Sequence, residues 1–512
     1  MKTSSDSVTL FVWSIALILG YNVTCAVLSS LDWAIVHDAP PMLYIARRML
    51  AGDVPYRDLY DFNMPGTYLL YMWGEQLFGF TDRAFRYFDI TFAVLGGLSI
   101  GMFCRRHGFA YVLIGCFVFV AYHLSWGGNS AGQRDFLMVP FLATGCNLVA
   151  SYLSRRSHQW VLLPAGLLIG FAAMIKPVAG ILLALLLPVV ALHQLPIRGM
   201  KIIAREIGLL VAGFLLTVSA IFLWLYSIGG MAGFIDVFSS FVPAYNRHFT
   251  TNPGYHPINT TYFRFSGMIA GLLFISAFIL KAYDIRFVIA SLGAAYGALH
   301  LYLQHQGWWY HFYPLAAFMI AFNLYNIPCL LRTNNNLGSI PLRMSFYLVL
   351  IATVLFYSNR DLRDKSQYAD QRSMISQLVR DVDNARKKYN DSLLEAQRYC
   401  HSGTPFEAAV PPNGTLVYKC PLSPQDFSSN EYTQFFDGPF CYVWNAAYRM
   451  NWLTANRTTF HYMLTNNIAE KNKNRLLQEM RADITRKTPT VIIFSRCAYD
   501  VLHVFRTMRS EE

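Results

Sequence analysis

Charged residues are scarce in this sequence. Only 14% of the 512 residues are charged, whereas 54% are hydrophobic and 15% are aromatic. A soluble globular protein has about 25% charged residues, so the deficit excludes a chain that is solvated by water on all sides. The aromatic content excludes a disordered, collagen-like or purely coiled-coil protein. Long apolar runs fill roughly the first 360 residues, and the last ~150 have the composition of a soluble domain. We therefore predict a polytopic α-helical membrane protein with a soluble tail.

Phosphate-cradling motifs are missing as well. The sequence has no Walker-type loop, no glycine-rich dinucleotide fingerprint and no His-Glu-x-x-His motif. The predicted cytoplasmic loops are too short to form a nucleotide-binding domain. The net charge of +12 does not indicate nucleic-acid binding, because many basic residues lie at the ends of apolar runs and none form a stretch interleaved with aromatic residues. Any activated substrate is therefore expected to reach the protein through the lipid bilayer.

The apolar runs predict about eleven membrane spans. Lys176-Pro177 separates two of them, and that pair can equally be one helix kinked at the proline. The first run follows a single lysine without a clear cleavage site, so it is predicted to remain as a membrane helix. The predicted spans are 9–31, 88–103, 109–125, 136–153, 160–175, 178–193, 207–228, 263–280, 286–303, 312–331 and 342–358.

Basic residues predict the orientation of these spans. They gather in alternate connections, which the positive-inside rule assigns to the cytoplasm. The residues concerned are Arg105, Arg106, Arg155, Arg156, Arg198, Lys201, Arg205, Lys281, Arg286, Arg332 and Arg343. The N-terminus is then cytoplasmic, and the first outer loop (32–87) and the tail lie outside. We predict a transmembrane domain over 1–358 and a small extracytoplasmic α/β or α+β domain over 359–512, in a bacterial inner membrane.

The tail carries the features of a small folded domain. A charged helical stretch covers 360–398, and strand-like runs follow at 414–418, 441–444 and 489–494. Four cysteines, Cys400, Cys420, Cys441 and Cys497, lie in the tail. An even number of cysteines outside the cytoplasm permits two disulfides in three connectivities, and we expect at least one. The other five cysteines lie in or beside spans and are predicted to be inert packing residues.

Asp38 is the strongest candidate for chemistry. It follows the first span at the outer membrane boundary, where a partly desolvated carboxylate can act as a base toward a hydroxyl or amine. The alternative is an N-cap for a helix over 42–50. His37, Asp58 and Asp61 lie in the same loop and are candidates for shaping an acceptor site, with solvated loop charge as the alternative for Asp58 and Asp61. The second half of the loop, 65–80, is aromatic and amphipathic, which predicts a helix in the membrane interface.

The segment from Asp38 to Tyr56, Asp-Ala-Pro-Pro-Met-Leu-Tyr-Ile-Ala-Arg-Arg-Met-Leu-Ala-Gly-Asp-Val-Pro-Tyr, resembles the first outer loop of the GT-C superfamily. It resembles most the branch of protein O-mannosyltransferases and lipid A aminoarabinose transferases. Similar landmarks follow in order over about 360 residues, a length that accommodates many spans: Asn63-Met-Pro-Gly-Thr-Tyr, Arg134-Asp-Phe-Leu-Met, Lys176-Pro and Gly307-Trp-Trp-Tyr-His-Phe-Tyr-Pro. The chain departs from that branch in having Ala39 where an acidic partner often follows the aspartate, and Asn63-Met64 where a lysine often stands.

The resemblance implies that Asp38 is the catalytic base and that Asp135 is a second site carboxylate. The alternative for Asp135 is a local ion pair with Arg134 that caps a helix. Lys176 lies between apolar runs, where an ionisable group is costly and marks a functional site; the alternative is a lysine that snorkels to the interface. A fixed ammonium there would stabilise a departing phosphate. His311 lies shortly before a proline that starts a helix. The tryptophans beside it are typical of the aromatic residues at a membrane interface, but that explanation does not account for a histidine. Tyr310, Arg134 and Arg247 complete the predicted donor contacts.

These observations predict an inverting glycosyltransferase that moves a sugar from a polyprenyl-phosphate donor to an extracytoplasmic glycan, lipid or protein. No cofactor is required by any motif, although the carboxylates near His37 leave room for a divalent metal. Two alternatives stay open. One is a surface-polysaccharide polymerase or ligase with a diphosphate-linked donor, and the other is a lipid or sugar transporter without chemistry. A transporter would show internal repeats with matching broken helices, and no convincing repeat is present.

Overall fold

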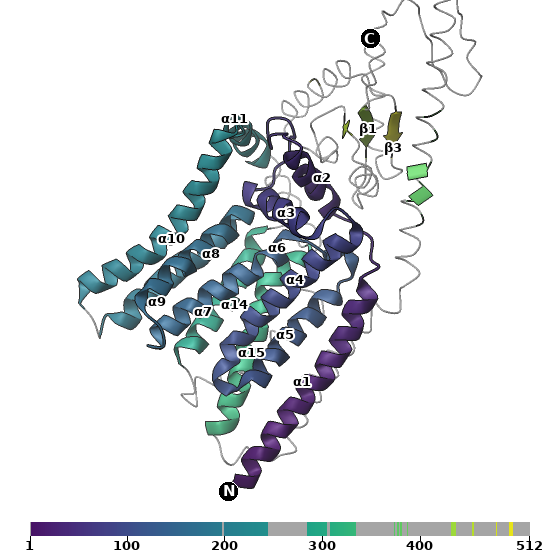
Figure 1. Cartoon of the computed structure of the whole chain (residues 1–512). Coiled ribbons are helices and arrows are strands. Elements are labelled where there is room, and N and C mark those ends of the chain that lie inside the picture. The colour runs from purple at the N-terminus through teal and green to yellow at the C-terminus, as the bar shows by residue number, and fades with distance from the viewer. Residues whose placement is uncertain are drawn as a thin grey trace, which may run out of the picture.

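The structure is a computed structural model of the whole chain. It describes residues 2–196, 199–243, 284–304 and 308–333, the strand segments 432–436, 453–454 and 491–494, and single helical positions at 373, 376, 377, 379, 380, 384, 387 and 478. In this part of the chain, long helices run side by side as a bundle, and several shorter helices cover one end of it (Figure 1).

The first half of the bundle runs from α1 to α8. Thr81 caps α4, because its hydroxyl accepts the backbone N–H of Ala84 at 3.1 Å, and Gly79 ends α3 with a positive φ of 99°. The helices are α1 (Lys2–Ser30), α2 (Ala39–Leu50), α3 (Pro65–Phe78), α4 (Asp82–Gly101), α5 (Phe109–Leu124), α6 (Arg134–Leu137), α7 (Val139–Leu153) and α8 (Leu162–Ile175), with short 3-10 turns η1 (Met102–His107), η2 (Gly128–Ser130) and η3 (Gln159–Val161) between them.

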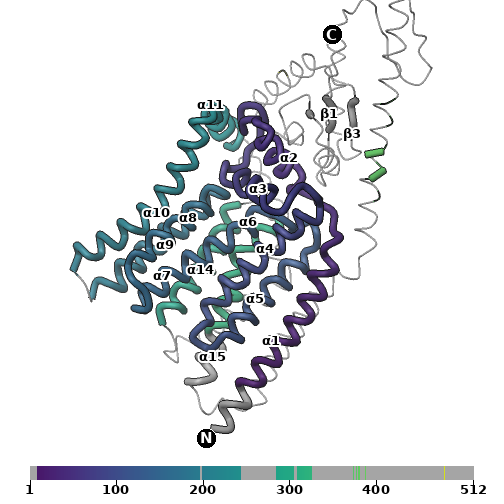
Figure 2. Tube along the Cα trace, in the orientation of Figure 1, coloured from purple at the N-terminus to yellow at the C-terminus, as the bar shows by residue number. Residues whose placement is uncertain are grey.

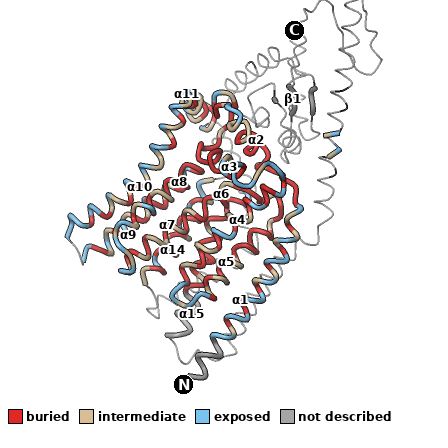
Figure 3. The backbone as a smooth tube through the Cα atoms, in the orientation of Figure 1, coloured by how far each residue is buried: buried red, intermediate tan, exposed pale blue. Residues whose placement is uncertain are grey.

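The second half follows the same up-and-down course, which the tube in Figure 2 traces. It contains η4 (Pro177–Ala179), α9 (Gly180–Gln194), α10 (Met200–Ser227), α11 (Met231–Asp236), the π-helical turn η5 (Val237–Phe241), α14 (Ile285–Gln304), the 3-10 turn η7 (Trp309–Phe312) and α15 (Tyr313–Thr333). Of the long apolar helices, α4 and α7 are the more buried, whereas α1 and α10 are exposed along much of their length (Figure 3).

Six of these helices are long and apolar enough to cross a membrane, namely Thr9–Ser30, Asp82–His107, Arg134–Leu153, Pro177–Gln194, Met200–Ser227 and Ile285–Gln304. Shorter apolar helices cover Phe109–Leu124, Gln159–Ile175 and Met231–Phe241. Nine predicted spans, all but 263–280 and 342–358, overlap helices of the structure. Those two lie outside the described residues. The apolar helices identify the chain as an integral membrane protein.

The pair of runs around Lys176 forms two helices and not one kinked helix. Lys176 ends α8 with an extended backbone, φ −147° and ψ 119°, and η4 starts at Pro177. The ring of a proline disfavours the helical region for the residue before it, so the sequence itself breaks the span here. The break places the lysine side chain at a helix end, where it can turn toward the neighbouring helices.

The first outer loop folds into α2 and α3, close to the helices predicted over 42–50 and 65–80. Pro65 begins α3, where its missing N–H costs nothing. Gly66 then touches α8, since a Cβ on it would lie 2.5 Å from the carbonyl oxygen of Met174. The Thr67 hydroxyl donates to the carbonyl of Ile175 at 3.3 Å. The loop is therefore fixed against the chain immediately before Lys176.

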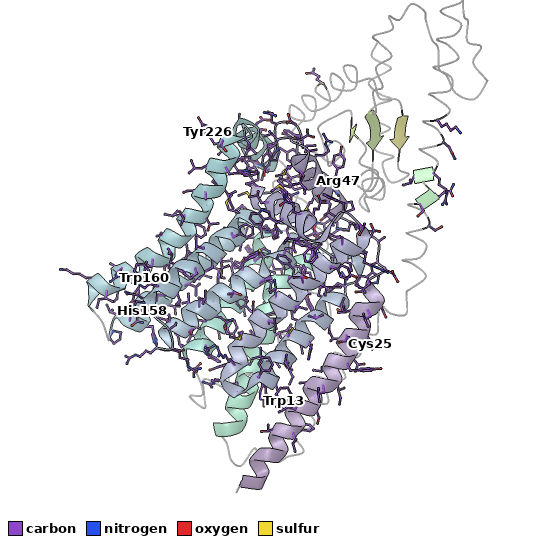
Figure 4. The ribbon with its side chains drawn as sticks, viewed as in Figure 1. Trp13, Cys25, Arg47, His158, Trp160 and Tyr226 are labelled. Atoms are coloured by element: carbon purple, nitrogen blue, oxygen red, sulfur yellow. The ribbon has the colours of Figure 1, made fainter. Side chains whose placement is uncertain are left out.

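The two ends of the bundle differ in what they carry. Figure 4 labels Arg47 on α2 and Tyr226 at the end of α10 at one end, and His158 and Trp160 at the other. At that second end Arg205 lies 5.5 Å from the centre of the Trp160 ring. Arg205 is one of the basic residues whose distribution predicted this end to be cytoplasmic.

Three strands are described in the tail, β1 (Tyr432–Phe436), β2 (Leu453–Thr454) and β3 (Val491–Phe494). They form a parallel sheet in the order β2-β1-β3, with Thr433 opposite Thr454 and Val491. β3 lies in the predicted strand 489–494; the other two predicted strands and the four tail cysteines lie outside the described residues. The domain over 359–512 and its disulfide remain predictions. Cys104, Cys116 and Cys146 are buried and Cys25 is exposed, and none of these four cysteines is in a disulfide.

Candidate active site

The predicted site residues that the structure describes gather at the end of the bundle that carries α2 and α3 (Figure 1). Asp38 follows the C-terminal end of α1, and Arg134 and Asp135 begin α6. Lys176 follows α8, and His311 lies in η7, just before α15 begins. Because alternate helix ends meet at one side of an up-and-down bundle, residues remote in sequence come together there.

Asp135 is the centre of a buried ionic cluster. Both of its carboxylate oxygens accept hydrogen bonds from the Lys176 ammonium, at 2.8 and 2.9 Å. One of them also lies 2.6 Å from Nε2 of His300 in α14. The Asp135 side chain is fully buried and that of Lys176 is 10% exposed. A buried carboxylate with two such partners stays charged and fixed in place.

Lys176 keeps one donor in this arrangement. An ammonium has three N–H groups, and two of them point to the two oxygens of Asp135. The alternative of a lysine that snorkels to the interface does not describe this side chain, because only a tenth of its surface is exposed.

Asp38 occupies the N-cap position of α2 but makes no capping hydrogen bond. One of its oxygens lies 3.2 Å from Nδ1 of His37. Its side chain is 19% exposed, whereas Asp61 and Asp135 are 1% and 0% exposed. Of the three carboxylates, only Asp38 is therefore open to a molecule arriving from outside.

The surroundings of Asp38 also set its protonation. Burial alone would raise the pKa of Asp38, but the charge and hydrogen bond of His37, the charge of Arg134 and a hydrogen bond from Gln133 lower it below its usual value. Burial likewise acts to lower the pKa of His37, and the neighbouring Asp38 carboxylate outweighs it and raises that pKa. The pair thus favours the ionised carboxylate of Asp38 and makes His37 easier to protonate than a free imidazole.

His37 is held in an uncommon conformation. Its φ is 63°, a region that residues other than glycine adopt rarely and mostly at special sites. The ring stands edge-on to Trp309 and Tyr310, with centroid distances of 5.2 and 5.9 Å. Gln133 Nε2 lies 3.0 Å from Nδ1 of the same ring. These contacts join the first outer loop to the predicted donor contacts around η7.

Arg134 links the two halves of the site. Its guanidinium donates to the side-chain oxygen of Asn63 and interacts electrostatically with Tyr310, Asp38 and Asp135. Its Nε is buried and has no hydrogen-bond partner among the described residues. A buried donor of this kind is costly to leave unpaired, so it points to a group that binds here.

Asp61 belongs to this site, whereas Asp58 does not. Asp61 accepts hydrogen bonds from the Tyr68 hydroxyl at 2.6 Å, the Phe62 backbone N–H at 2.6 Å and the Asn63 amide at 2.9 Å. Burial raises its pKa despite these donors and the charge of Arg134. The alternative of solvated loop charge is therefore wrong for Asp61.

Asp58 behaves as that alternative describes. Its side chain is 35% exposed, and it accepts from Arg57 at 2.7 Å and from the Val54 backbone N–H at 2.8 Å. These contacts are local to its own turn, so the structure does not bring Asp58 to the other candidates. Arg247, a predicted donor contact, lies outside the described residues.

His311 and Tyr310 line the same cluster. Both are buried, and the ring centroids of His311 and His300 are 6.4 Å apart. His311 also interacts electrostatically with Asp135. Its Nδ1 is buried and, within the ranges that the structure describes, has no hydrogen-bond partner. His311 Nδ1 is therefore a second buried polar atom, after Nε of Arg134, without a partner among the described residues.

Sequence reasoning missed His300, Asp89 and His123. His300 is fully buried and binds Asp135, and Asp89 and His123 bind each other at 2.8 Å. The sequence carried a signal for all three, since each is an ionisable residue inside a predicted span. Gln133 was missed too, and a lone glutamine in a loop gave no comparable signal.

A divalent metal would need a group of ligands that the described side chains do not form. In the described part of the chain, no three His, Cys, Asp or Glu side chains lie together as a metal site requires. The nearest carboxylates are already bound, Asp135 by Lys176 and Asp61 by Tyr68.

No protein-family model matches the sequence, and the search of curated proteins found no relative. Solved structures do match. ArnT from Cupriavidus metallidurans, bound to undecaprenyl phosphate, aligns at a TM-score of 0.44 and 15% identity over 66% of this chain. This chain covers 62% of ArnT, less than two thirds of its length.

An Archaeoglobus fulgidus oligosaccharyltransferase tethered to an acceptor peptide aligns at a TM-score of 0.48 and 12% identity, over 90% of this chain and 68% of its own. AglB from the same organism, in complex with an inhibitory peptide and dolichol-phosphate, aligns at 0.45 and 12% over the same shares. Because these TM-scores are below 0.5, the activity of this chain has to be argued from its own residues.

Proposed function

We propose that this chain is an integral-membrane glycosyltransferase that moves a sugar from a polyprenyl-phosphate donor to an extracytoplasmic acceptor, with inversion at the anomeric carbon. One observation carries the proposal. Asp38 is a partly exposed carboxylate beside a cluster of cationic side chains, and two buried polar atoms of that cluster, Nε of Arg134 and Nδ1 of His311, have no partner in the described part of the chain.

Asp38 acts as the general base. Its pKa is held low by His37 and Arg134 against the opposing effect of burial, so it is a carboxylate at neutral pH and is free to accept a proton. It takes the proton of the acceptor hydroxyl or amine as that atom bonds to the anomeric carbon. The bond between the anomeric carbon and the phosphate oxygen breaks on the opposite face, and its electron pair stays with the lipid phosphate.

The phosphate end of the donor is bound by fixed positive charge. The third N–H of Lys176, Nε of Arg134 and the Nδ1–H of a neutral His311 are the donors available for its oxygens. Such preorganised donors stabilise the charge that develops on the leaving phosphate. Asp135 does not touch the reacting atoms in this scheme; it orients Lys176 through two hydrogen bonds. The proposal includes the orientation predicted from the basic residues, with the site on the extracytoplasmic side and the N-terminus in the cytoplasm.

The test uses the purified full chain in lipid nanodiscs. The probes are undecaprenyl-phosphate carrying one of a panel of radiolabelled hexoses and pentoses, with lipids and proteins of the source cells as acceptors. Release of free undecaprenyl phosphate and transfer of label are both measured. We expect Asp38→Asn to lower turnover by about 10²–10⁴-fold, the usual contribution of a general base, without loss of undecaprenyl-phosphate binding.

Asp32→Asn is the matched control. Asp32 lies in the same loop, its side chain is 66% exposed, and it pairs with the exposed Arg83, so turnover should not change. Full activity of Asp38→Asn would contradict the assigned base. A parallel assay with undecaprenyl-diphosphate sugars distinguishes the proposed function from a polymerase or ligase. Transfer from the diphosphate donors alone would contradict a monophosphate donor.

A further inference from the structure

A second buried ionic cluster lies beside the candidate site. Asp89 in α4 is fully buried, and Arg86 and His123 are each 1% exposed. One carboxylate oxygen of Asp89 accepts from Arg86 and lies 2.8 Å from Nε2 of His123. The other accepts the backbone N–H of Gly132 at 2.7 Å. The desolvation of such charges offsets much of their attraction, so stability alone is a weak explanation for the cluster.

The cluster contacts each of three segments that carry site residues. Arg86 donates to the Ser30 hydroxyl at 3.0 and 3.1 Å, at the end of α1 that leads to His37 and Asp38. Nδ1 of His123 lies 2.8 Å from the Tyr313 hydroxyl, directly after η7. Gly132 precedes Gln133, Arg134 and Asp135 in the chain. Hydropathy places these three segments at the same end of the bundle but does not fix their relative positions. The buried network fixes those positions.

Gly132 is held from both sides. Its N–H donates to Asp89, and its carbonyl accepts from the Tyr71 hydroxyl. Its φ is +67°, and a Cβ would lie 2.7 Å from both the Phe85 ring and the Tyr71 hydroxyl. Only glycine fits such a position without strain. The direction in which the chain enters α6 is therefore fixed at this residue.

We propose that Asp89 is a positioning residue that, with the Tyr71 hydroxyl, clamps Gly132 and thereby orients Gln133, Arg134 and Asp135 toward Asp38 and Lys176. The consequence for turnover rests on the proposed function, whereas the clamp itself does not. Misplacement of a catalytic group by about 1 Å can lower a rate by roughly 10²-fold, so a residue that touches no substrate can still set the rate.

Two double variants test the clamp. Arg86→Met with Asp89→Asn removes the buried charges but keeps an oxygen that can accept from Gly132. Arg86→Met with Asp89→Leu removes the charges and that acceptor together. Both variants are neutral at these positions, so neither leaves an uncompensated buried charge, which is the usual cause of severe destabilisation. Tyr71→Phe is a milder second test, because it removes only the hydrogen bond to the Gly132 carbonyl.

The readouts are hydrogen exchange of the backbone amides over 131–138, thermal unfolding and turnover of the undecaprenyl-phosphate sugar, all in nanodiscs. We expect the two double variants to unfold at similar temperatures. The Asp89→Leu double variant should exchange these amides about tenfold faster than the Asp89→Asn double variant, because a tenfold change corresponds roughly to the loss of one buried hydrogen bond. Its turnover should be at least tenfold lower. Tyr71→Phe should speed exchange several-fold over the same amides.

Glu206→Gln is the matched control, since Glu206 is a fully buried carboxylate in α10 bound to Tyr152. It should leave exchange over 131–138 unchanged. The clamp would be overturned if the two double variants exchanged at the same rate and Tyr71→Phe exchanged at the wild-type rate. It would also be overturned if turnover fell only in proportion to the unfolding temperature. The wild-type protein could transfer no sugar while the variants still show the expected differences in hydrogen exchange. That result would support the clamp and overturn the proposed function.

Discussion

Replacing Lys176 with methionine separates the two roles of this lysine. Its ammonium holds both oxygens of the buried Asp135 carboxylate, and methionine has a similar length without the charge. Breaking a buried ion pair by removing one partner costs about 3–5 kcal/mol, because the other charge is left uncompensated. Here His300 still contacts the carboxylate at 2.6 Å. We therefore expect a loss near the lower end, about 3 kcal/mol.

The assay is thermal unfolding of the purified protein, followed by tryptophan fluorescence, together with equilibrium binding of undecaprenyl phosphate. Lys176→Met should lower both stability and binding. Adding Asp135→Leu removes the uncompensated charge and should restore most of the stability, but binding should stay weak because the ammonium is still missing. Lys201→Met, at an exposed position in α10, should change neither. Unchanged stability of Lys176→Met would refute the buried ion pair, and restored binding in the double variant would refute phosphate contact by Lys176.

Three further outcomes follow from the described contacts. His37→Gln removes the partner that lowers the pKa of Asp38, so the base becomes protonated at a higher pH, and the acid limb of log kcat/KM should move to higher pH; an unmoved limb would contradict the pairing. Tyr68→Phe removes a hydrogen bond to a buried carboxylate and should lower stability by roughly 1.5–3 kcal/mol, measured by thermal unfolding. Gly132→Ala forces a positive φ on alanine, at about 1–2 kcal/mol plus a clash, and should lower both unfolding temperature and turnover, whereas Gly208→Ala, with open space around it, should not.

The location of the site could be predicted from the sequence because hydropathy fixes where helices end. Asp38, Asp135, Lys176 and His311 all lie at ends of apolar runs that the positive-inside pattern assigns to one side. Four residues on one side of a small bundle must lie within a limited area. The proline after Lys176 made the helix break predictable too, although the sequence left a kinked helix open.

The pairing of these side chains could not be predicted. Hydropathy gives the ends of helices but not their neighbours, so nothing in the sequence indicated that Lys176 binds Asp135, or that His300 binds the same carboxylate. The distinction between Asp58 and Asp61 was equally hidden. They are three residues apart in one loop, yet one pairs with its neighbour Arg57 and the other is buried among three donors.

The pairings decide which carboxylate can serve as the base. A base must be charged, reachable and free to accept a proton. Asp135 is charged but fully buried and has both oxygens bound to Lys176, so protonating it would break the strongest contacts in the site. Asp61 is enclosed by its three donors. Asp38 alone among the three combines a lowered pKa with an exposed edge. We infer that the buried carboxylates organise the cations, and that the partly exposed one carries the proton.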